Sequence, residues 1–534
     1  MTEIESGPAA RGRLRTLGSL IDFHAARRPD KVAIHFDGKT LTYRQWQMRS
    51  NRIANALLAT GSPRQARIAY LGKNDSRYFE ALIGCGKAGM VLAPISWRLA
   101  LPEILFLLDD FDTECLIIDR DFLHYLDQIR AARPSFRKVV VIDGEAPDTE
   151  PFDAWRDRHA DSDPALDLSG DEVVAQLHTS GTTGRPKGAM LTHGNLLWSA
   201  RHAESGELTA WGEEDLSLVP LPLFHSGGTC WAMYAIYVGG GIYITREAGP
   251  DHVLAALASA PITKAGLVPA LIQMVLNDPK FDRSNIGSLQ TIGYGGSPIT
   301  VDLLRRGIQE LGCGFIQMFG MTETSTMGTT LLPEDHDFNR PHLLTSCGKP
   351  LHDMSIRIVD GDGRELPNGQ TGEILLRCGS VMKGYYGKPE ATAEVLVDGW
   401  YHSGDAGYLD EEGYLYVRDR IKDMIISGGE NIYPAEVETA LASHPAVLEV
   451  GVIGVPSVKW GEDVKAFVVL RKGHHAGAEE LIAFTKTRIA SFKAPKSIEF
   501  IDALPRNASG KILKREMRAP YWDRAADARQ VAGT

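Results

Sequence analysis

Apolar residues along the first third of the chain follow two periods, one typical of helices and one of strands. Between residues 43 and 57 they recur every three to four positions, directly after a Thr-x-x-Gln capping box at Thr42 and Gln45. Short aliphatic runs without this period predict strands. The predicted helices are 17–28, 43–60 and 76–89, and the predicted strands are 67–71, 90–94, 114–118, 139–142 and 173–178. Such alternation favours layered α/β structure with parallel strands.

The residue composition and the predicted pattern of elements change twice after this region. Residues 144–170 are rich in Asp, Pro and Ala, which predicts a surface connection. From about residue 345 short strands alternate with turns, which predicts a β-rich subdomain. Its predicted strands are 355–359, 372–377 and 414–418; beyond them we predict helices at 435–443 and 479–489 and strands at 447–455 and 464–470.

We therefore predict an α/β protein of two domains. A large N-terminal domain, residues 1–419, combines layered α/β subdomains with the β-rich subdomain. A small α+β C-terminal domain covers 420–534. The boundary lies in the charged run 418–423.

Composition and charge exclude several classes of protein. The chain has 534 residues, of which 43% are hydrophobic and 23% charged, as in ordinary globular proteins. The net charge of −11 argues against a nucleic-acid binder but leaves room for a local anion site. Six cysteines without a Cys-x-x-Cys pair predict reduced, buried thiols. Without a long apolar run or a signal-like N-terminus, we expect no membrane span and a cytoplasmic location.

A segment rich in Gly and hydroxyl side chains follows the predicted strand 173–178. It reads His178-Thr179-Ser180-Gly181-Thr182-Thr183-Gly184-Arg185-Pro186-Lys187-Gly188. Glycines allow several backbone N–H groups to point at one anion, hydroxyls add donors, and a lysine adds charge. The spacing does not fit the G-x-x-x-x-G-K-[ST] loop. We predict a phosphate site formed by Thr179, Ser180, Gly181, Thr182, Thr183, Gly184 and Lys187.

This segment resembles the phosphate loop of the adenylate-forming superfamily, which includes acyl-CoA synthetases, amino-acid adenylation domains and beetle luciferases. Seven more segments resemble motifs of that superfamily, in the same order. They are Pro-Leu-Phe-His-Ser-Gly-Gly (222–228), Gly-Tyr-Gly-Gly-Ser-Pro (293–298), Met-Phe-Gly-Met-Thr-Glu (318–323), Tyr-His-Ser-Gly-Asp (401–405), Asp-Arg-Ile-Lys-Asp (419–423), Gly-Gly-Glu-Asn-Ile-Tyr-Pro (428–434) and Pro-Arg-Asn-Ala-Ser-Gly-Lys (505–511). Eight such segments in order are far more specific than any one of them.

The resemblance implies a nucleotide-binding ligase, an AMP-forming acyl-CoA synthetase. An acid and MgATP would give acyl-AMP and pyrophosphate, and CoA would then give acyl-CoA and AMP. The implied small molecules are ATP, Mg²⁺, coenzyme A and a carboxylic acid. The chemistry is reasonable, because a carboxylate has no good leaving group, whereas acyl-AMP can lose AMP when its carbonyl is attacked. The charge that grows on the α-phosphate during adenylation needs nearby cations.

The resemblance also implies roles for single residues in adenylation. Lys511 would bridge the attacking carboxylate and the α-phosphate, Glu323 would bind Mg²⁺, and Thr322 would contact the phosphates. His225 would guard the acid pocket or orient the carboxylate. The residues expected around the rest of the nucleotide are Gly295, Gly296, Ser297, Phe319, Gly320, Met321, Asp405 and Arg420, with Asp405 on the ribose.

Thioester formation would use a second arrangement of the C-terminal domain. By resemblance that domain rotates about Lys422, Lys511 leaves, and Gly429 and Trp460 face CoA. Phe492 and Lys493 align with further CoA contacts of the family. The chain departs from the family pattern in three places: His178 and Phe319 replace other aromatic residues, and Ala494 stands where some members have Arg.

The acid substrate is expected to be a fatty or an aryl acid. The run 224–228 has no Asp to pair with an α-ammonium group, which argues against amino acids. The segment 421–434 resembles the same segment of bacterial fatty-acyl-CoA and aryl-CoA ligases. This resemblance implies a role in fatty acid and lipid metabolism. Mostly apolar or small residues are the candidate pocket walls: Thr229, Val268, Tyr294, Gly295, Met318 and Met321.

Two other functions stay open. The chain could load a carrier protein, although the CoA-facing features favour the free thiol, or it could bind nucleotide and acid without turnover. The resemblance also leaves open a homodimer, and acetylation of Lys511 by a lysine acetyltransferase, reversed by a deacetylase, which would remove the catalytic charge.

Overall fold

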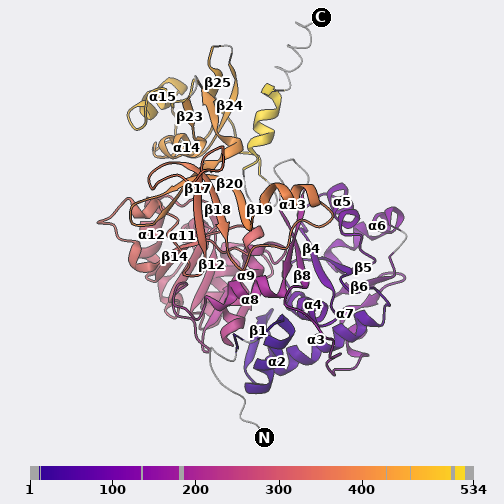
Figure 1. Ribbon diagram of the computed structural model, residues 1–534. Coiled ribbons are helices and arrows are strands. Elements are labelled where there is room, and N and C mark those ends of the chain that lie inside the picture. Colours follow the sequence, from indigo (N-terminus) through magenta and orange to yellow (C-terminus); the bar gives the residue numbers. More distant parts are fainter. Residues whose placement is uncertain are drawn as a thin grey trace, which may run out of the picture. The chain divides into compact units, whose positions relative to one another are not determined.

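The computed structural model describes residues 11–12, 14–133, 136–179, 186–427, 430–457, 459–506 and 512–522. The chain divides into two compact units (Figure 1). The first unit comprises Met1–Ile356 and Leu376–Tyr401, and the second comprises Arg357–Leu375 and His402–Thr534. The predicted boundary at 419/420 marks a hinge about which a domain would rotate, not a division into compact units, and it stays a prediction.

A seven-stranded sheet forms one half of the first unit, with the strand order β7-β6-β5-β3-β4-β8-β9. Neighbouring strands are parallel except for β9, which returns antiparallel to β8. The predicted parallel strands are therefore confirmed, with ends shifted by a residue or two. The strands are β3 (Arg67–Leu71), β4 (Val91–Ile95), β5 (Cys115–Asp119), β6 (Lys138–Ile142), β7 (Glu150–Pro151), β8 (Val173–Thr179) and β9 (Lys187–Thr192).

A nine-stranded sheet forms the other half, in the order β16-β15-β14-β13-β12-β10-β11-β1-β2. Its central strands are parallel, while β2, β15 and β16 at the two edges are antiparallel to their neighbours. The strands are β1 (Val32–Phe36), β2 (Lys39–Thr42), β10 (Leu216–Val219), β11 (Gly241–Ile244), β12 (Lys264–Leu267), β13 (Thr291–Gly295), β14 (Gly314–Phe319), β15 (Thr329–Leu331) and β16 (Lys349–Pro350).

Helices fill the space between these two sheets and cover their outer faces (Figure 1). Helix α4 contacts strands of both sheets, and α8 on the first sheet packs against α9 on the second. The helices are α2 (Leu17–Arg27), α3 (Tyr43–Leu58), α4 (Ser76–Lys87), α5 (Leu101–Phe111), α6 (Leu126–Ala132), α7 (Phe152–Asp157), α8 (His193–Arg201), α9 (Ser226–Val238), α10 (Pro250–Ser259), α11 (Pro269–Asn277), α12 (Val301–Leu311) and α13 (Pro389–Val395).

Alternation along the strands explains the layers. In β3, Ala69 and Leu71 pack in one hydrophobic core with Phe111 of α5, so Tyr70 between them faces the other side of the sheet. The predicted capping box is confirmed at α3: Thr42 Oγ1 accepts from the Gln45 backbone N–H (3.3 Å), and Gln45 Oε1 accepts from the Thr42 backbone N–H (3.0 Å).

The prediction of a plain surface connection at 144–170 is wrong in its middle. Strand β7 and helix α7 form there, and Phe152 and Trp155 of α7 are buried. The two aromatic rings, three residues apart, share one helix face that packs against α3. The surrounding Asp and Pro residues dominate the composition and hide that short apolar face.

The second unit contains a five-stranded α+β sheet in the order β23-β22-β25-β24, with β26 parallel to β25. Helices α14 and α15 pack over it around Val437, Leu441 and Leu481. These elements match the predicted small unit. Their bounds are β22 (Ile425–Ser427), β23 (Glu430–Ile432), α14 (Pro434–Ala442), β24 (Val447–Ser457), β25 (Gly461–Leu470), α15 (Ala478–Lys486) and β26 (Ser497–Phe500).

The predicted β-rich region is a separate sheet of five strands. The strand order is β17-β18-β20-β19, and β21 pairs with β20. The bounds are β17 (Ser355–Val359), β18 (Gly372–Arg377), β19 (Leu396–Val397), β20 (Trp400–Leu409) and β21 (Leu415–Arg420). Short 3-10 helices elsewhere are η1 (Arg120–Tyr125), η2 (Arg283–Ile286), η3 (Thr322–Thr324), η4 (Pro333–Asp335), η5 (Leu343–Thr345) and η6 (Ile421–Asp423).

All six cysteines are free thiols, as expected. Cys85, Cys115 and Cys230 are buried, whereas Cys313, Cys347 and Cys378 are only partly covered. Within the described ranges, no helix combines the length and the apolar character that crossing a bilayer requires.

Candidate active site

The predicted site segments of the first unit follow the carboxyl ends of strands in its two sheets. Segment 222–228 comes after β10, Gly295 ends β13, and Phe319 ends the neighbouring strand β14. Because β10, β12, β13 and β14 are parallel, the segments after them meet at one edge of the nine-stranded sheet. In open α/β sheets this edge is where ligands bind.

The predicted phosphate segment connects β8 to β9. Thr179 pairs with Lys187 and His178 pairs with Gly188 at the two ends of this segment. Thr179 and Lys187 are described. Ser180, Gly181, Thr182, Thr183 and Gly184 lie outside the described residues. The ends of the predicted phosphate site are therefore held by strand pairing on both sides.

Tyr385 connects two of the predicted residues. Its hydroxyl donates a hydrogen bond of 2.8 Å to Glu323 Oε1, and the Lys187 ammonium lies 5.0 Å from the centre of its ring. Tyr385 forms an isolated backbone bridge with Ala189 of β9. The Met382 N–H donates to the Glu323 carbonyl (2.7 Å). The predicted phosphate lysine and the predicted Mg²⁺ ligand thus share one neighbour.

Sequence reasoning missed Tyr385. The signal for it is weak: two tyrosines, Tyr385 and Tyr386, directly after Gly384 in a polar stretch. Only the pairing of this stretch with β9 shows which residues it reaches.

A second contact joins two hydroxyl side chains at the same edge. Ser226 Oγ, at the start of α9, lies 3.0 Å from Thr322 Oγ1, at the start of η3. Gly320 allows this loop to fold tightly, since a Cβ atom there would lie 2.3 Å from the Thr326 carbonyl oxygen. Backbone packing thus requires glycine at this position.

His225 immediately precedes Ser226 and is neutral at pH 7. Burial, aided by the Arg98 charge, lowers the pKa of its imidazole to about 4. Its Nε2 atom is buried and has no hydrogen-bond partner in the part of the chain that the structure describes. The free-energy penalty of burying this atom without a hydrogen bond is already part of the folded state, so a ligand that bonds to it would relieve that penalty.

The residues predicted for the adenine side lie next to one another. Gly295 pairs with Met318 across β13 and β14, and Gly296 follows with a φ of +76°, which glycine adopts without strain. Ser297 comes next, and Phe319, Gly320 and Met321 leave the adjacent strand end. The structure therefore brings both predicted nucleotide segments together.

The candidate acid-pocket residues are not all on one face. Thr229 is fully buried and bonded to the Tyr78 hydroxyl (2.8 Å) and the Leu223 carbonyl (2.7 Å). Tyr294 packs in the outer core, and its hydroxyl bonds His336 Nε2 (3.0 Å). Val268, Met318 and Met321 are partly exposed near the strand ends.

Trp231 of α9 covers the inner face of the same strands. A Cβ atom on Gly293 would lie 2.3 Å from its Cζ3 atom, and one on Gly266 would lie 2.7 Å from its Cγ and Cδ2 atoms. Gly266 and Gly293 are neighbours across β12 and β13. Two glycines therefore make room for one indole, whose buried Nε1 has no hydrogen-bond partner within the described residues.

In the second unit, Asp405 and Arg420 are cross-strand neighbours on β20 and β21. Arg420 Nε lies 2.8 Å from Asp405 Oδ1, and Arg420 Nη1 donates to the Ser403 carbonyl (2.9 Å). The Ser403 hydroxyl accepts from the Asp405 backbone N–H (3.0 Å). The predicted ribose carboxylate, which is buried, and its partly exposed cation thus form one ion pair.

The predicted hinge lies at the end of β21. Lys422 is exposed in η6, and its carbonyl accepts from the Arg518 guanidinium (3.2 Å). The neighbouring Asp419 accepts from the Ala435 N–H through Oδ2 (2.8 Å), which is also 3.8 Å from Lys514 Nζ.

Lys514 and Glu438 form a buried ion pair that sequence reasoning missed. Lys514 Nζ lies 2.9 Å from Glu438 Oε1. Burial opposes the Lys514 charge, but Glu438 and Asp419 outweigh it and raise the pKa of Lys514. Lys511, three residues earlier, lies outside the described residues, and an isolated bridge between Arg506 and Ile512 brackets its segment.

The residues predicted to face CoA lie partly in described structure. Trp460 is 44% exposed in the β24–β25 turn, beside Gly461, which pairs with Ser427 of β22. Gly429 follows Ser427 but lies outside the described residues. Phe492 is also exposed, Lys493 is paired with Glu436 (2.8 Å), and Ala494 is fully buried.

His178, one of the departures from the family pattern, lies near the end of β8 and packs against α5. Its ring lies 4.6 Å from that of Phe111, and Nε2 is 3.7 Å from Asp110 Oδ2. Asp110 also pairs with Lys388. Burial lowers the pKa of His178, so the ring is neutral at pH 7 and fills the space of an ordinary aromatic residue.

Comparison with known proteins agrees with this arrangement. The family model of the AMP-binding enzyme matches residues 21–386. The chain belongs to this family. The model of the AMP-binding enzyme C-terminal domain matches residues 436–511. The resemblance to adenylate-forming enzymes and the predicted α/β fold class are therefore confirmed.

Individual members of the AMP-binding family are similar along nearly their whole length. A fatty acid–[acyl-carrier-protein] ligase of Streptomyces coeruleorubidus is 41% identical, over 96% of this chain and 98% of its own. A feruloyl-CoA synthase of Amycolatopsis is 40% identical, over 95% and 100%. The solved o-succinylbenzoate CoA synthetase of Bacillus subtilis, in complex with its acyl-adenylate intermediate, has a TM-score of 0.80 at 31% identity, covering 93% of this chain and 97% of its own.

Proposed function

We propose that this protein is an acid–CoA ligase that forms AMP. A carboxylic acid and MgATP give acyl-AMP and pyrophosphate, and CoA then displaces AMP to give acyl-CoA. The observation that carries the proposal is the cluster at the carboxyl ends of the strands, where Tyr385 contacts both Lys187 and Glu323. It stands within a chain that belongs to the AMP-binding enzyme family.

The residues proposed for adenylation suit its chemistry. The Lys187 ammonium and the hydroxyl of Thr322 can stabilise phosphate charge, which grows during attack on the α-phosphorus. The neutral His225 can present an N–H or a lone pair to the acid without competing for its charge. Asp405 can accept from ribose hydroxyls while Arg420 holds it in place. Lys511 would bridge the two reacting groups.

Glu323 fits a Mg²⁺ ligand. A hard cation prefers carboxylate oxygen, and the hydrogen bond from Tyr385 orients this carboxylate within the cluster. Bound Mg²⁺ would neutralise phosphate charge and orient the pyrophosphate leaving group.

Two variants of the full chain test the reaction sequence. Lys511→Ala is expected to reduce acid-dependent pyrophosphate release about 10²–10³-fold and to keep conversion of supplied acyl-AMP to thioester. Gly429→Leu is expected to do the reverse, because a side chain there would obstruct the pantetheine arm. If both variants lose the same half-reaction, the proposed rotation about Lys422, between residues 1–419 and 420–534, is wrong.

The first measurement is pyrophosphate release across aliphatic, aryl and amino acids, with and without CoA. Release that becomes catalytic only with CoA supports the ligase. Lack of release with every acid, together with tight ATP binding, supports the non-catalytic alternative.

For the acid we propose an aryl or short aliphatic substrate. Trp231 fills the space between α9 and the strands β12 and β13, so a longer acid cannot enter this space. Trp231→Ala is expected to shift kcat/KM toward longer acids by about 10-fold or more, since several methylenes would gain an apolar surface. An unchanged chain-length profile would place the pocket elsewhere.

Transfer to a carrier protein is the second candidate. The 41% identity to a fatty acid–[acyl-carrier-protein] ligase favours it, as does Ala494, whose buried methyl offers no cation to a CoA phosphate. Comparing kcat/KM for CoA with that for a phosphopantetheinylated carrier protein separates the two acceptors.

Three further expectations rest on the family resemblance. They are a cytoplasmic location, which the six free thiols support, a homodimer, and regulation through acetylation of Lys511. Light scattering gives the oligomeric state. An unchanged adenylation rate after acetylation at Lys511 would remove the regulatory proposal.

A further inference from the structure

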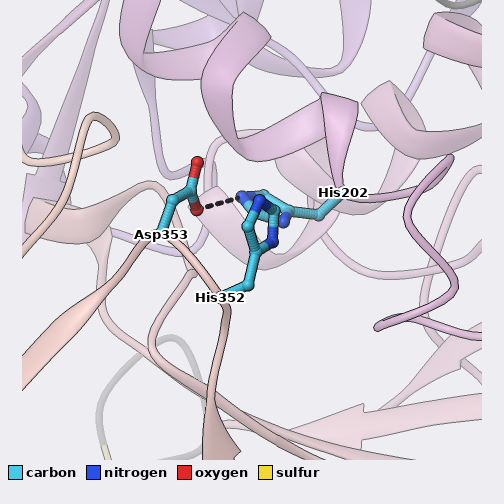
Figure 2. Close-up of side chains that lie close together, drawn as sticks. All are labelled: His202, His352 and Asp353. Atoms are coloured by element: carbon cyan, nitrogen blue, oxygen red, sulfur yellow. Dashed lines mark ion pairs between the residues drawn. The ribbon is translucent and has the colours of Figure 1, made fainter.

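A cluster of imidazole and carboxylate groups lies in the first unit, apart from the residues proposed for adenylation. Figure 2 shows His202, at the C-terminal end of α8, beside His352 and Asp353. The last two precede β17, in the turn that the Met354 N–H closes onto the Leu351 carbonyl (3.0 Å). One ligand atom of each of the three side chains lies within 4.8 Å of the other two.

A fourth residue, Glu207, sets the orientation of both imidazole rings. Its Oε2 atom lies 3.0 Å from His202 Nδ1 and 2.8 Å from His352 Nδ1, and its Oε1 accepts from the His352 backbone N–H (2.6 Å). A carboxylate oxygen only accepts hydrogen bonds, so each Nδ1 carries the hydrogen. In a neutral ring, the other nitrogen, Nε2, then presents a lone pair.

The Nε2 atom of His202 is left without a hydrogen-bond partner. The side chain is fully buried, and the nearest charged oxygen, Asp353 Oδ1, is 3.3 Å away (Figure 2). The second Asp353 oxygen pairs with Arg201. A lone pair and a carboxylate oxygen that face each other in a buried place repel each other unless a proton or a metal cation lies between or beside them. The convergence of a third ligand, His352, indicates a metal ion.

The distance between the ligand atoms of His202 and Asp353 fits a small tetrahedral ion. Bonds of about 2.0–2.1 Å in tetrahedral geometry put neighbouring ligand atoms about 3.3–3.4 Å apart, and the His202 Nε2 to Asp353 Oδ1 distance is 3.3 Å. His352 is 66% exposed, so its ring can adjust and an ion can enter from solvent. Two imidazoles and one carboxylate select Zn²⁺ and similar ions over Mg²⁺ and Ca²⁺, which prefer oxygen ligands.

We propose that His202, His352 and Asp353 bind a divalent transition-metal ion such as Zn²⁺, with water in the fourth position. Glu207 acts as the outer carboxylate that orients both imidazoles. The ion joins the C-terminal end of α8 to the turn before β17. The site is independent of the Mg²⁺ proposed at Glu323.

The test uses the full chain, stripped with a chelator and titrated with Co²⁺ and then Zn²⁺. We expect one equivalent of Co²⁺ to give the visible absorption of a tetrahedral site, and Zn²⁺ to displace it while millimolar Mg²⁺ does not. Zn²⁺ at 100 times its Kd is expected to raise the free energy of unfolding by about 2.7 kcal/mol.

Variants identify the ligands. His352→Gln and Asp353→Asn, both at exposed residues that the fold tolerates, are expected to weaken binding more than 100-fold, and Glu207→Gln by about 10–100-fold. His342→Gln, at an exposed histidine outside the cluster, is the matched control and should bind as the parent does. Glu323→Gln should also keep the site.

Saturable binding that is lost in His352→Gln and kept in His342→Gln and Glu323→Gln supports the proposal. Absence of saturable Co²⁺ and Zn²⁺ binding by the folded parent overturns it and leaves a hydrogen-bonded ion-pair cluster. Equal binding by the parent and His352→Gln overturns it as well.

Discussion

In the first unit, the polar groups proposed for adenylation are held by buried contacts, whereas the segments of the second unit proposed to face CoA are exposed. Glu323 is anchored by Tyr385, and Thr322 contacts Ser226, in largely covered surroundings. Trp460 and Phe492 of the second unit are 44% and 45% exposed.

This difference corresponds to the two half-reactions. Stabilising charge on a phosphoryl group requires polar groups that are oriented in advance and shielded from water. Accepting a flexible pantetheine arm requires a surface that a large ligand can reach from solvent. Elsewhere in the second unit, the ion pair of Lys514 with Glu438 is largely covered.

The largest expected effect breaks the anchored side of this comparison. Glu323→Gln should lower the rate of acyl-AMP formation about 10²–10³-fold, because a neutral amide cannot hold the cation. Tyr385→Phe should lower it about 10-fold, since only the orientation of the carboxylate is lost. Pyrophosphate release measures both effects, and conversion of supplied acyl-AMP should change less than twofold. Equal losses in the two half-reactions would show that the contacts serve the fold alone.

A second change tests whether the second unit has a rigid base. Lys514→Met should destabilise the protein by about 3–5 kcal/mol, because Glu438 would keep an unpaired buried charge. The double variant Lys514→Met, Glu438→Leu should recover most of this loss. Thermal unfolding measures both, with Lys472→Met at an exposed lysine as the control. A double variant no more stable than the single one would contradict the ion-pair explanation.

A smaller effect concerns acid stability of the first unit. Burial lowers the pKa of His193 to about 4, from an ordinary value near 6.5. As the pH falls below 6.5 the unfolded chain binds a proton that the folded chain does not, so stability falls. Between pH 7.5 and 5 the free energy of unfolding should fall by about 2 kcal/mol because of this residue.

His193→Asn tests that expectation. Asn Oδ1 can replace His193 Nδ1 as the acceptor for the Leu17 N–H (3.2 Å) and does not titrate. The unfolding free energy of the variant should depend less steeply on pH than that of the parent. Identical slopes would assign the acid sensitivity to other groups.

The smallest effect tests the exposed side of the comparison. Trp460→Ala should raise the KM for CoA about 10-fold, as for the loss of one partly exposed aromatic contact. Acyl-AMP formation should be unchanged, because no residue proposed for adenylation contacts Trp460 among the residues that the structure describes. A change in the acid-dependent step instead of the CoA step would move Trp460 to the other half-reaction.

The sequence predicted the layered α/β class, the parallel strands and the capping box at Thr42, because periodicity and local hydrogen bonding are short-range properties. It also located the site segments, because they resemble motifs of a known family in the same order. The missed helix at 152–157 shows the limit: its apolar face is two residues wide, and it is recognisable only from the helix that it packs against.

Tertiary structure alone decided which of these segments meet. The pairing of residues 382–386 along β9 brings Tyr385 to Glu323, 62 positions away in sequence. Folding likewise places His202 beside His352 and Asp353, although no motif spacing connects them. Local pattern determines which elements form, because their hydrogen bonds are local. The positions of long-range partners depend on strand order and helix packing, which no single segment encodes.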